Sequence, residues 1–274
     1  MGADDAMRKS MAEIQAKMEQ GWLPPEDLCA ACATGKLHKL QKHKHVGGDL
    51  QVKGPDGDTG LHKAAGRGEL DVVRYLLENG CEAIIDCRGN NSMTPLMYAA
   101  RNFQIECAWL LLQSGADPTL KGGRENLTAE GLAHENGKAK TDAAKKQTQA
   151  AKKAATAKVE VASLLASFLR AAKIGSLNKK GGIRPNWLKR RFVLDKDRLE
   201  LRYYDDAWAQ KGSINLRGAH SADCFRRSTA SGVTAADNEL EIELLDRTYR
   251  LRAENDGEVD SWVEALRDAC NLAA

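Results

Sequence analysis

The spacing of apolar residues divides the chain into two parts near residue 172. Before this point, apolar residues recur every three or four positions, which places them on one side of an α-helix. After it, they recur every second position over short runs, the period of a half-buried β-strand. The pattern therefore predicts a helical first part and a mainly β second part.

The first expected helix lies between residues 4 and 20, in an N-terminal segment of residues 1–23. Its apolar side is formed by Met7, Met11, Ile14 and Met18. We expect this side to pack on the following domain. A helix lying in a membrane surface is the less favoured alternative, because acidic and basic residues mix on the polar side.

Residues 24–140 contain an internal repeat. Matching positions 35 residues apart are Leu61 and Leu96, Ala64 and Ala99, Leu76 and Leu111, and Gly80 and Gly115. A period of this length predicts a solenoid of helical hairpins, in which each copy buries its apolar face against its neighbours. The motifs TGLHKAA from Thr59 and MTPLMYAA from Met93, each followed by an LLxxG ending, resemble ankyrin repeats.

Two further copies depart from the motif and are expected to be degenerate caps. Residues 28–40 fit as a first repeat, and residues 126–138 as the start of a last one. Gly60 stands where the family usually has proline. Glu130 stands where it has leucine, so we expect the last copy to be exposed or incomplete. His62 is the motif histidine and is expected to hydrogen-bond within its turn, near Thr59.

Residues 141–172 form a linker rich in alanine and lysine that contains neither glycine nor proline. This composition favours one long helix, beginning as the second helix of the last repeat and ending packed against a domain. Its second half has an apolar side formed by Val159, Leu164, Leu165, Phe168 and Leu169. The lysines of the first half are interpreted as a solvated face, with attraction to an acidic membrane as the alternative.

The charge of the chain is concentrated in the hairpin that follows the linker. Residues 173–191 contain seven basic residues and no acidic ones, although the formal net charge of the whole chain is only +3. Two alternating runs flank a loop with Gly181, Gly182 and Pro185, which predicts two strands joined by a turn that an anion can approach closely. Lys179 and Arg190 share the parity of the apolar residues, so we expect both at the rim of the buried face.

Between Gly175 and Leu194, the pattern GxLxK, a glycine-rich loop and WxxRxFVL resemble the opening of a pleckstrin-homology (PH) domain. Further strands are expected at residues 198–204, 211–216, 220–226, 239–245 and 247–252, and a helix at residues 258–272. For residues 173–272 the resemblance implies a seven-stranded β-barrel capped by the C-terminal helix. It also implies that Trp262, in that helix, belongs to the core.

The same resemblance implies a phosphoinositide site at the open end of the barrel. The family uses a lysine at the end of the first strand, a basic residue just after the tryptophan and an arginine two positions later. Lys179 and Arg190 match the first and third positions, whereas Leu188 occupies the second. Tyr203 stands where some members contact phosphate. We expect weak and poorly selective binding, because the basic set is incomplete.

A basic surface around this site is expected to face an anionic membrane. It consists of Lys180, Arg184, Lys189 and Arg191. Nucleic acid is not an expected partner, because the cluster lacks a recognition helix and a series of stacking aromatic residues.

Neither cofactor nor metal is expected. Cys29 and Cys32, followed by His43 and His45, offer the ligand types of a zinc site, but their spacing does not fit the usual one. The seven cysteines are odd in number and scattered through helical patterns, which predicts reduced thiols. No signal peptide or run of eighteen apolar residues occurs, so a cytoplasmic location with reversible recruitment to a membrane is expected.

The sequence shows no nucleophile elbow, phosphate-binding loop, HExxH motif or dinucleotide fingerprint, so we expect no enzyme activity. The favoured function is a signalling adaptor. Its ankyrin repeats would bind a protein, and its PH-like domain an acidic, phosphoinositide-containing membrane. One alternative is a protein-only scaffold whose PH-like domain binds no lipid. The other is the regulatory fragment of a larger lipid-transfer or GTPase-regulating protein.

Overall fold

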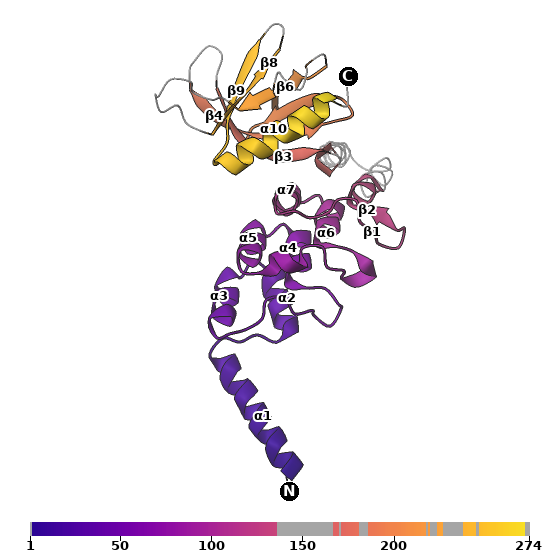
Figure 1. The fold of residues 1–274 in the computed structure, drawn as a ribbon. Helices are drawn as coiled ribbons and strands as arrows, with labels where there is room; N and C mark the ends of the chain where they lie inside the picture. Colours follow the sequence, from indigo (N-terminus) through magenta and orange to yellow (C-terminus); the bar gives the residue numbers. More distant parts are fainter. Residues whose placement is uncertain are drawn as a thin grey trace, which may run out of the picture. The chain divides into compact units, whose positions relative to one another are not determined.

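The computed structural model describes residues 2–135, 167–169, 171–180, 186–217, 219, 224–226, 238–244 and 247–271. The chain divides into two compact units, Met1–Leu169 and Arg170–Ala274. The first is mainly helical, and the second is built on a β-sheet covered by a helix (Figure 1). This division confirms the predicted change from helices to strands near residue 172. None of the described helices is long and apolar enough to span a membrane.

The first unit begins with α1 (Gly2–Glu19), which is followed by pairs of shorter helices. The pairs are α2 (Pro25–Ala33) with α3 (Leu37–His45), α4 (Gly60–Arg67) with α5 (Leu70–Glu78), and α6 (Pro95–Arg101) with α7 (Ile105–Gln113). Two 3-10 helices, η1 (Cys81–Ile84) and η2 (Asn90–Ser92), lie between the second and third pairs. After α7 come the short paired strands β1 (Lys121–Gly122) and β2 (Leu127–Thr128), and then helical residues 129–135.

Helix α4 packs against α2 on one side and against α6 on the other, so neighbouring pairs share one apolar core. The matching residues Leu61 and Leu96 are both fully buried, as are Ala64 and Ala99. Residues 28–40, predicted to be a degenerate first repeat, form most of a complete helix pair. The predicted last copy has its first helix within the described residues, and the remainder of that copy lies outside them.

Gly60 replaces the usual proline for a steric reason. A Cβ atom built on Gly60 would lie 2.6 Å from the Sγ of Cys32, which is fully buried in the preceding repeat. In the next repeat the corresponding residue is Pro95, at the first turn of α6. Glycine at position 60 therefore leaves the space that the Cys32 thiol occupies.

His62 joins two repeats as well as closing its own turn. Its Nδ1 accepts from the backbone N–H of Thr59 (3.2 Å) and lies 2.8 Å from the Thr59 hydroxyl, as predicted. Its Nε2 lies 3.1 Å from the carbonyl oxygen of Cys87 and 3.0 Å from that of Met93. Burial lowers the pKa of His62, and the favourable influence of Asp58 and the two carbonyls does not reverse this. The imidazole is therefore held neutral.

This neutral histidine predicts that the repeats lose stability in acid. The pKa of His62 is lower in the folded protein than in the unfolded chain, where it is about 6.5. The contribution of neutral His62 to the free energy of unfolding is therefore complete above about pH 6.5 and is lost as the pH falls below this value. The loss is at most about 1.4 kcal/mol per pH unit. Urea unfolding at pH 7.5 and pH 5.5 measures the loss. His62→Gln is the control, because glutamine at this helix position retains an acceptor for the Thr59 N–H but does not titrate. An equal loss in both proteins would assign the acid sensitivity to another group.

Two expectations for the helical part need correction. Helix α1 forms as predicted, but Met11, Ile14 and Met18 are 63%, 46% and 44% exposed, so its apolar side does not pack on the repeats. The linker helix does not continue to residue 172, because the N–H of Ala172 donates to the carbonyl of Leu194 and so belongs to the sheet. Its end is buried through Phe168, whose ring lies 5.3 Å from that of Trp109 in α7. Residues 136–166 lie outside the described part, together with most of the predicted helix.

The second unit contains one antiparallel sheet of seven strands in the order β6-β5-β4-β3-β9-β8-β7. The strands are β3 (Lys173–Lys180), β4 (Trp187–Asp195), β5 (Glu200–Tyr204), β6 (Gln210–Asn215), β7 (Cys224–Arg226), β8 (Glu239–Glu243) and β9 (Thr248–Arg252). All seven were predicted, with ends displaced by a few residues. Strands β6 and β7 lie at the two ends of this order among the described residues, so closure into a barrel stays a prediction. The strands β1 and β2 in the first unit were not predicted.

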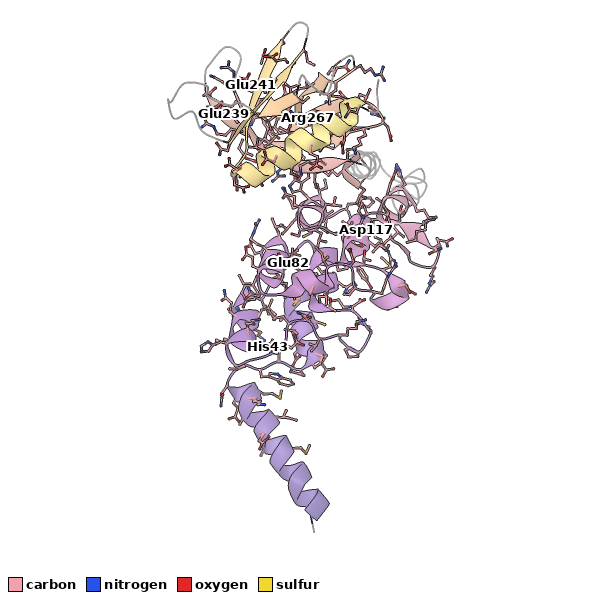
Figure 2. All side chains as sticks on the ribbon, in the orientation of Figure 1. His43, Glu82, Asp117, Glu239, Glu241 and Arg267 are labelled. Carbon is pink, nitrogen blue, oxygen red and sulfur yellow. The ribbon has the colours of Figure 1, made fainter. Side chains whose placement is uncertain are left out.

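The C-terminal helix α10 (Asp256–Asn271) covers the sheet, as the yellow helix in Figure 1 shows. Its apolar side packs against β7 and β8 and carries Trp262, which is only 2% exposed. The ring of Trp262 lies 6.4 Å from that of Phe192 in an edge-to-face arrangement. The prediction that Trp262 belongs to the core is confirmed. The Nε of Arg267, labelled in Figure 2, donates to the carbonyl of Cys224 and ties α10 to β7.

Candidate functional site

The register of β3 and β4 determines which side chains meet at the rim of the buried face. Leu177 pairs with Arg190, and Lys179 pairs with Leu188. Along β4, exposure rises from buried Phe192 through half-buried Arg190 to exposed Leu188. The alternation therefore places Lys179 and Arg190 on the core-facing side, at the end of the hairpin, as predicted.

Strand β5 brings Tyr203 to the same place, because Tyr203 pairs with Phe192. The ammonium nitrogen of Lys179 lies 5.2 Å from the centre of the Tyr203 ring. The structure thus brings together the three residues predicted to bind a headgroup, Lys179, Arg190 and Tyr203.

Two further residues belong to this cluster and were missed from the sequence. Lys179 pairs with Leu251 of β9, which turns Tyr249 toward the same rim, 5.8 Å from the Lys179 nitrogen. The guanidinium of Arg247 stacks on the Tyr249 ring at 4.9 Å. Within the strand expected at residues 247–252, Tyr249 shares the parity of Leu251. Which strand lies beside Lys179 depends on long-range pairing that periodicity does not reveal.

The cluster is cationic, and the described residues place no carboxylate in an ion pair with it. Within the described part of the chain, Lys179, Arg190 and Arg247 form no ion pair with a carboxylate. Burial, and then the charges of Arg247 and Arg190, lower the pKa of Lys179. Three like charges held together in this way favour an anion between them, and phosphate oxygens accept well from both ammonium and guanidinium groups. We call these three residues with Tyr203 and Tyr249 the rim cluster.

The opposite face of the sheet contrasts with the rim cluster. Lys189 forms an ion pair with Glu254 (3.1 Å), and Arg252 forms one with Glu239 (2.6 Å). Glu239 and Glu241, labelled in Figure 2, are both buried on β8, and Arg250 pairs with Glu241 at 2.6 Å. Lys189, Arg250 and Arg252 on this face are therefore each balanced by a carboxylate.

The four basic residues predicted to face an anionic membrane around the site have different contacts from those of the rim cluster. Lys189 is paired as described. The guanidinium of Arg191 stacks over Trp208 at 4.1 Å, and the Lys180 nitrogen lies 6.0 Å from the centre of the Trp187 ring. Arg184 lies outside the described residues. The pairing of Lys189 with Glu254 reduces its expected attraction to an anionic surface.

The cysteine and histidine residues weighed as zinc ligands are engaged in the first repeats. The Nδ1 of His43 accepts from the Leu23 N–H (2.8 Å), and its Nε2 donates to the Asp49 carbonyl (3.2 Å). Buried His43, labelled in Figure 2, thereby ties the segment before α2 to the loop after α3, whereas His45 is exposed. The thiol of Cys29 donates to the carbonyl of Asp58. Among the described residues, no group of three or more His, Cys, Asp or Glu side chains is placed to hold a metal ion.

The repeat unit contains a cavity of about 350 Å³ beside α6 and the β1–β2 ribbon. Its lining includes the apolar side chains of Met93 and Leu132 and four charged side chains. The charged residues are Arg101, Arg124, Glu125 and Glu135. This mixture of apolar side chains and charges of both signs suits contact with a protein segment.

Comparison with known protein families identifies both units. A family model for ankyrin repeats, in three copies, matches residues 28–122, and a PH domain model matches residues 171–271. The chain therefore contains three ankyrin repeats at residues 28–122, followed by a PH domain at residues 171–271. This confirms the resemblance drawn from the motifs of both units.

Three relatives each match about a third of this chain. It is 39% identical over 84 residues to human BCL-6 corepressor-like protein 1, covering 31% of this chain and 4% of that protein. It is 33% identical over 98 residues to human palmitoyltransferase ZDHHC13, covering 35% of this chain and 15% of that protein. It is 34% identical over 91 residues to rat diacylglycerol kinase zeta, covering 33% of this chain and 10% of that protein. The chain thus spans a small part of each relative.

Proposed function

We propose that this protein is a non-catalytic adaptor that holds a protein partner on its ankyrin repeats and attaches to an acidic, phosphoinositide-containing membrane through its PH domain. The architecture supports a protein-interaction module with possible lipid binding. The observation that carries the lipid-binding part is the rim cluster. Its three cations lie together and form no ion pair with a carboxylate of the described residues.

The chemistry of the rim cluster suits a phosphorylated headgroup. The two arginines offer planar donors that bind phosphate oxygens in pairs, and Lys179 adds a point charge between two aromatic rings. At about 1 kcal/mol for each basic residue near an anionic surface, three cations supply about 3 kcal/mol, which is weak binding. We therefore expect reversible attachment from the cytoplasm that a second contact strengthens, such as a membrane-bound protein held by the repeats.

Co-sedimentation of the full chain with liposomes tests this function. The liposomes contain neutral lipid alone, neutral lipid with phosphatidylserine, or both with mixed phosphoinositides, at low and physiological salt. Arg190→Ala is expected to weaken the phosphoinositide-dependent binding about fivefold, because each cation supplies about 1 kcal/mol. Arg247→Ala is expected to act in the same direction.

Lys189→Ala is the matched control, since it removes the same charge from the neighbouring residue on the opposite face. We expect it to change binding less than twofold. Equal losses in Arg190→Ala and Lys189→Ala would indicate nonspecific attraction to a basic surface. Absence of binding to every liposome would favour a scaffold whose two domains both bind proteins.

A further inference from the structure

Leu188 has an unusual position for an exposed leucine. It is 40% exposed, and it is the one large apolar side chain exposed in the described part of the PH domain. It lies directly across from Lys179 on the rim, on the same side of β4 as Arg190. Taken alone, a single exposed leucine needs no explanation. Here it stands among cations that form no ion pairs with described carboxylates.

The surroundings of Leu188 indicate whether the rim cluster suits a free inositol phosphate or the same headgroup on a lipid in a bilayer. A free inositol phosphate in water offers only charged and hydroxyl groups, which gain nothing from contact with a leucine. An acidic bilayer offers phosphate groups beside an apolar layer. A rim that combines cations with one protruding apolar side chain therefore complements the bilayer better than the free headgroup.

We propose that Leu188 enters the apolar layer of an acidic bilayer while Lys179, Arg190 and Arg247 hold the phosphates of a lipid headgroup. This inference rests on the proposed function and deepens it, because the domain then recognises the lipid in its bilayer and binds the free headgroup poorly. Burying the exposed part of one leucine is worth about a factor of five to ten in a binding constant. The apolar contact of Leu188 with the bilayer thereby compensates, in membrane binding, for the basic residue that is missing at this position.

An acidic protein surface would match the charge of the rim, but it would not use Leu188 in the same way. The centre of a protein interface buries several neighbouring apolar or aromatic side chains together. In the described part of the domain, no second large apolar side chain is exposed beside Leu188. Insertion into a bilayer needs only one such side chain, so the bilayer is the occupant that the rim favours.

The test compares vesicles with a soluble headgroup, using the full chain. Vesicles contain phosphatidylcholine, phosphatidylserine and phosphatidylinositol bisphosphate, and calorimetry with inositol trisphosphate measures the free headgroup. Leu188→Ala is expected to weaken vesicle binding about five- to tenfold and to change inositol trisphosphate binding less than twofold. Leu188→Lys is expected to tighten inositol trisphosphate binding about fivefold, because it restores the missing base.

Lys189→Ala is the control, because Lys189 is the next residue of β4 but lies on the opposite face, and it should change vesicle binding less than twofold. Unchanged vesicle binding in Leu188→Ala, with a clear loss in Arg190→Ala, would overturn this inference and leave the proposed function standing. An equal loss for vesicles and for inositol trisphosphate would also overturn it. Absence of vesicle binding by the unaltered chain, or indifference to Arg190→Ala, would overturn the proposed function itself.

Discussion

Asp58→Ala is expected to lower the free energy of unfolding of the ankyrin repeats by about 3–5 kcal/mol. Asp58 is only 1% exposed, and its carboxylate joins two repeats. It accepts from the hydroxyl of Tyr98 (2.8 and 2.9 Å), the ammonium of Lys63 (2.9 Å) and the N–H of Asn90 (2.8 Å). Burial acts to raise the pKa of Asp58, but these hydrogen bonds outweigh it and lower the pKa. Removing the carboxylate leaves all three donors without this acceptor.

Urea unfolding of the full chain, followed by the helical signal, measures the Asp58 effect. Asp56→Ala is a matched control, because Asp56 also pairs with Lys63 but is 41% exposed at its side chain. We expect that variant to lose less than about 1 kcal/mol, as exposed ion pairs do. Tyr98→Phe removes one donor from Asp58 and should lose about 1 kcal/mol. Equal losses in Asp58→Ala and Asp56→Ala would show that the buried network is not what stabilises the repeats.

Trp262→Ala is expected to lower the free energy of unfolding of the PH domain by about 3–5 kcal/mol. The indole is 2% exposed and packs directly on the backbone of β3. A Cβ atom built on Gly175 would lie 3.0 Å from the Trp262 ring, so the ring occupies the space that a side chain would need. Its edge meets Phe192, and the Lys173 nitrogen lies 5.4 Å from the ring centre. Alanine would leave a cavity between α10 and the sheet that these neighbours cannot fill.

Hydrogen exchange of the intact chain separates the PH domain from the repeats, because it reports protection peptide by peptide. Trp262→Ala should reduce protection throughout residues 171–271 and leave residues 28–122 unchanged. Trp208→Ala is the control, since Trp208 is a half-buried tryptophan in the β5–β6 turn, and should cost about 1 kcal/mol or less. If Trp262→Ala fails to express, Gly175→Ala tests the same contact by crowding the ring, with an expected loss of about 1–3 kcal/mol. Full protection in both variants would contradict a core role for Trp262.

The candidate site was predictable where it depended on one hairpin. The alternation within β3 and β4 is local, and it placed Lys179 and Arg190 on the core-facing side without knowledge of the fold. The PH resemblance then added Tyr203. Arg247 and Tyr249 were not predictable in this way, because they reach the rim only through the pairing of β9 with β3, about 70 residues apart in the chain.

Local periodicity also could not predict which charged side chains form ion pairs or which apolar side chains stay exposed. The sequence showed Lys189 and Lys179 as members of one basic cluster, but the fold pairs Lys189 with Glu254 and leaves Lys179 beside two arginines. The periodicity of α1 showed an apolar side but not whether anything covers it. The partner of a side chain lies elsewhere in the chain, so its identity depends on contacts that a local pattern does not contain.

For this protein, the sequence alone determined the helical repeat, the seven strands, the capping helix and the face of each strand. These features follow from backbone geometry, because residues on one face recur about every 3.6 positions along a helix and about every 2 positions along a strand. Only the tertiary structure decided which charges are balanced, which apolar side chains remain exposed and which distant strand completes the rim cluster. These depend on strand order and register, which arise from packing the whole domain around one core.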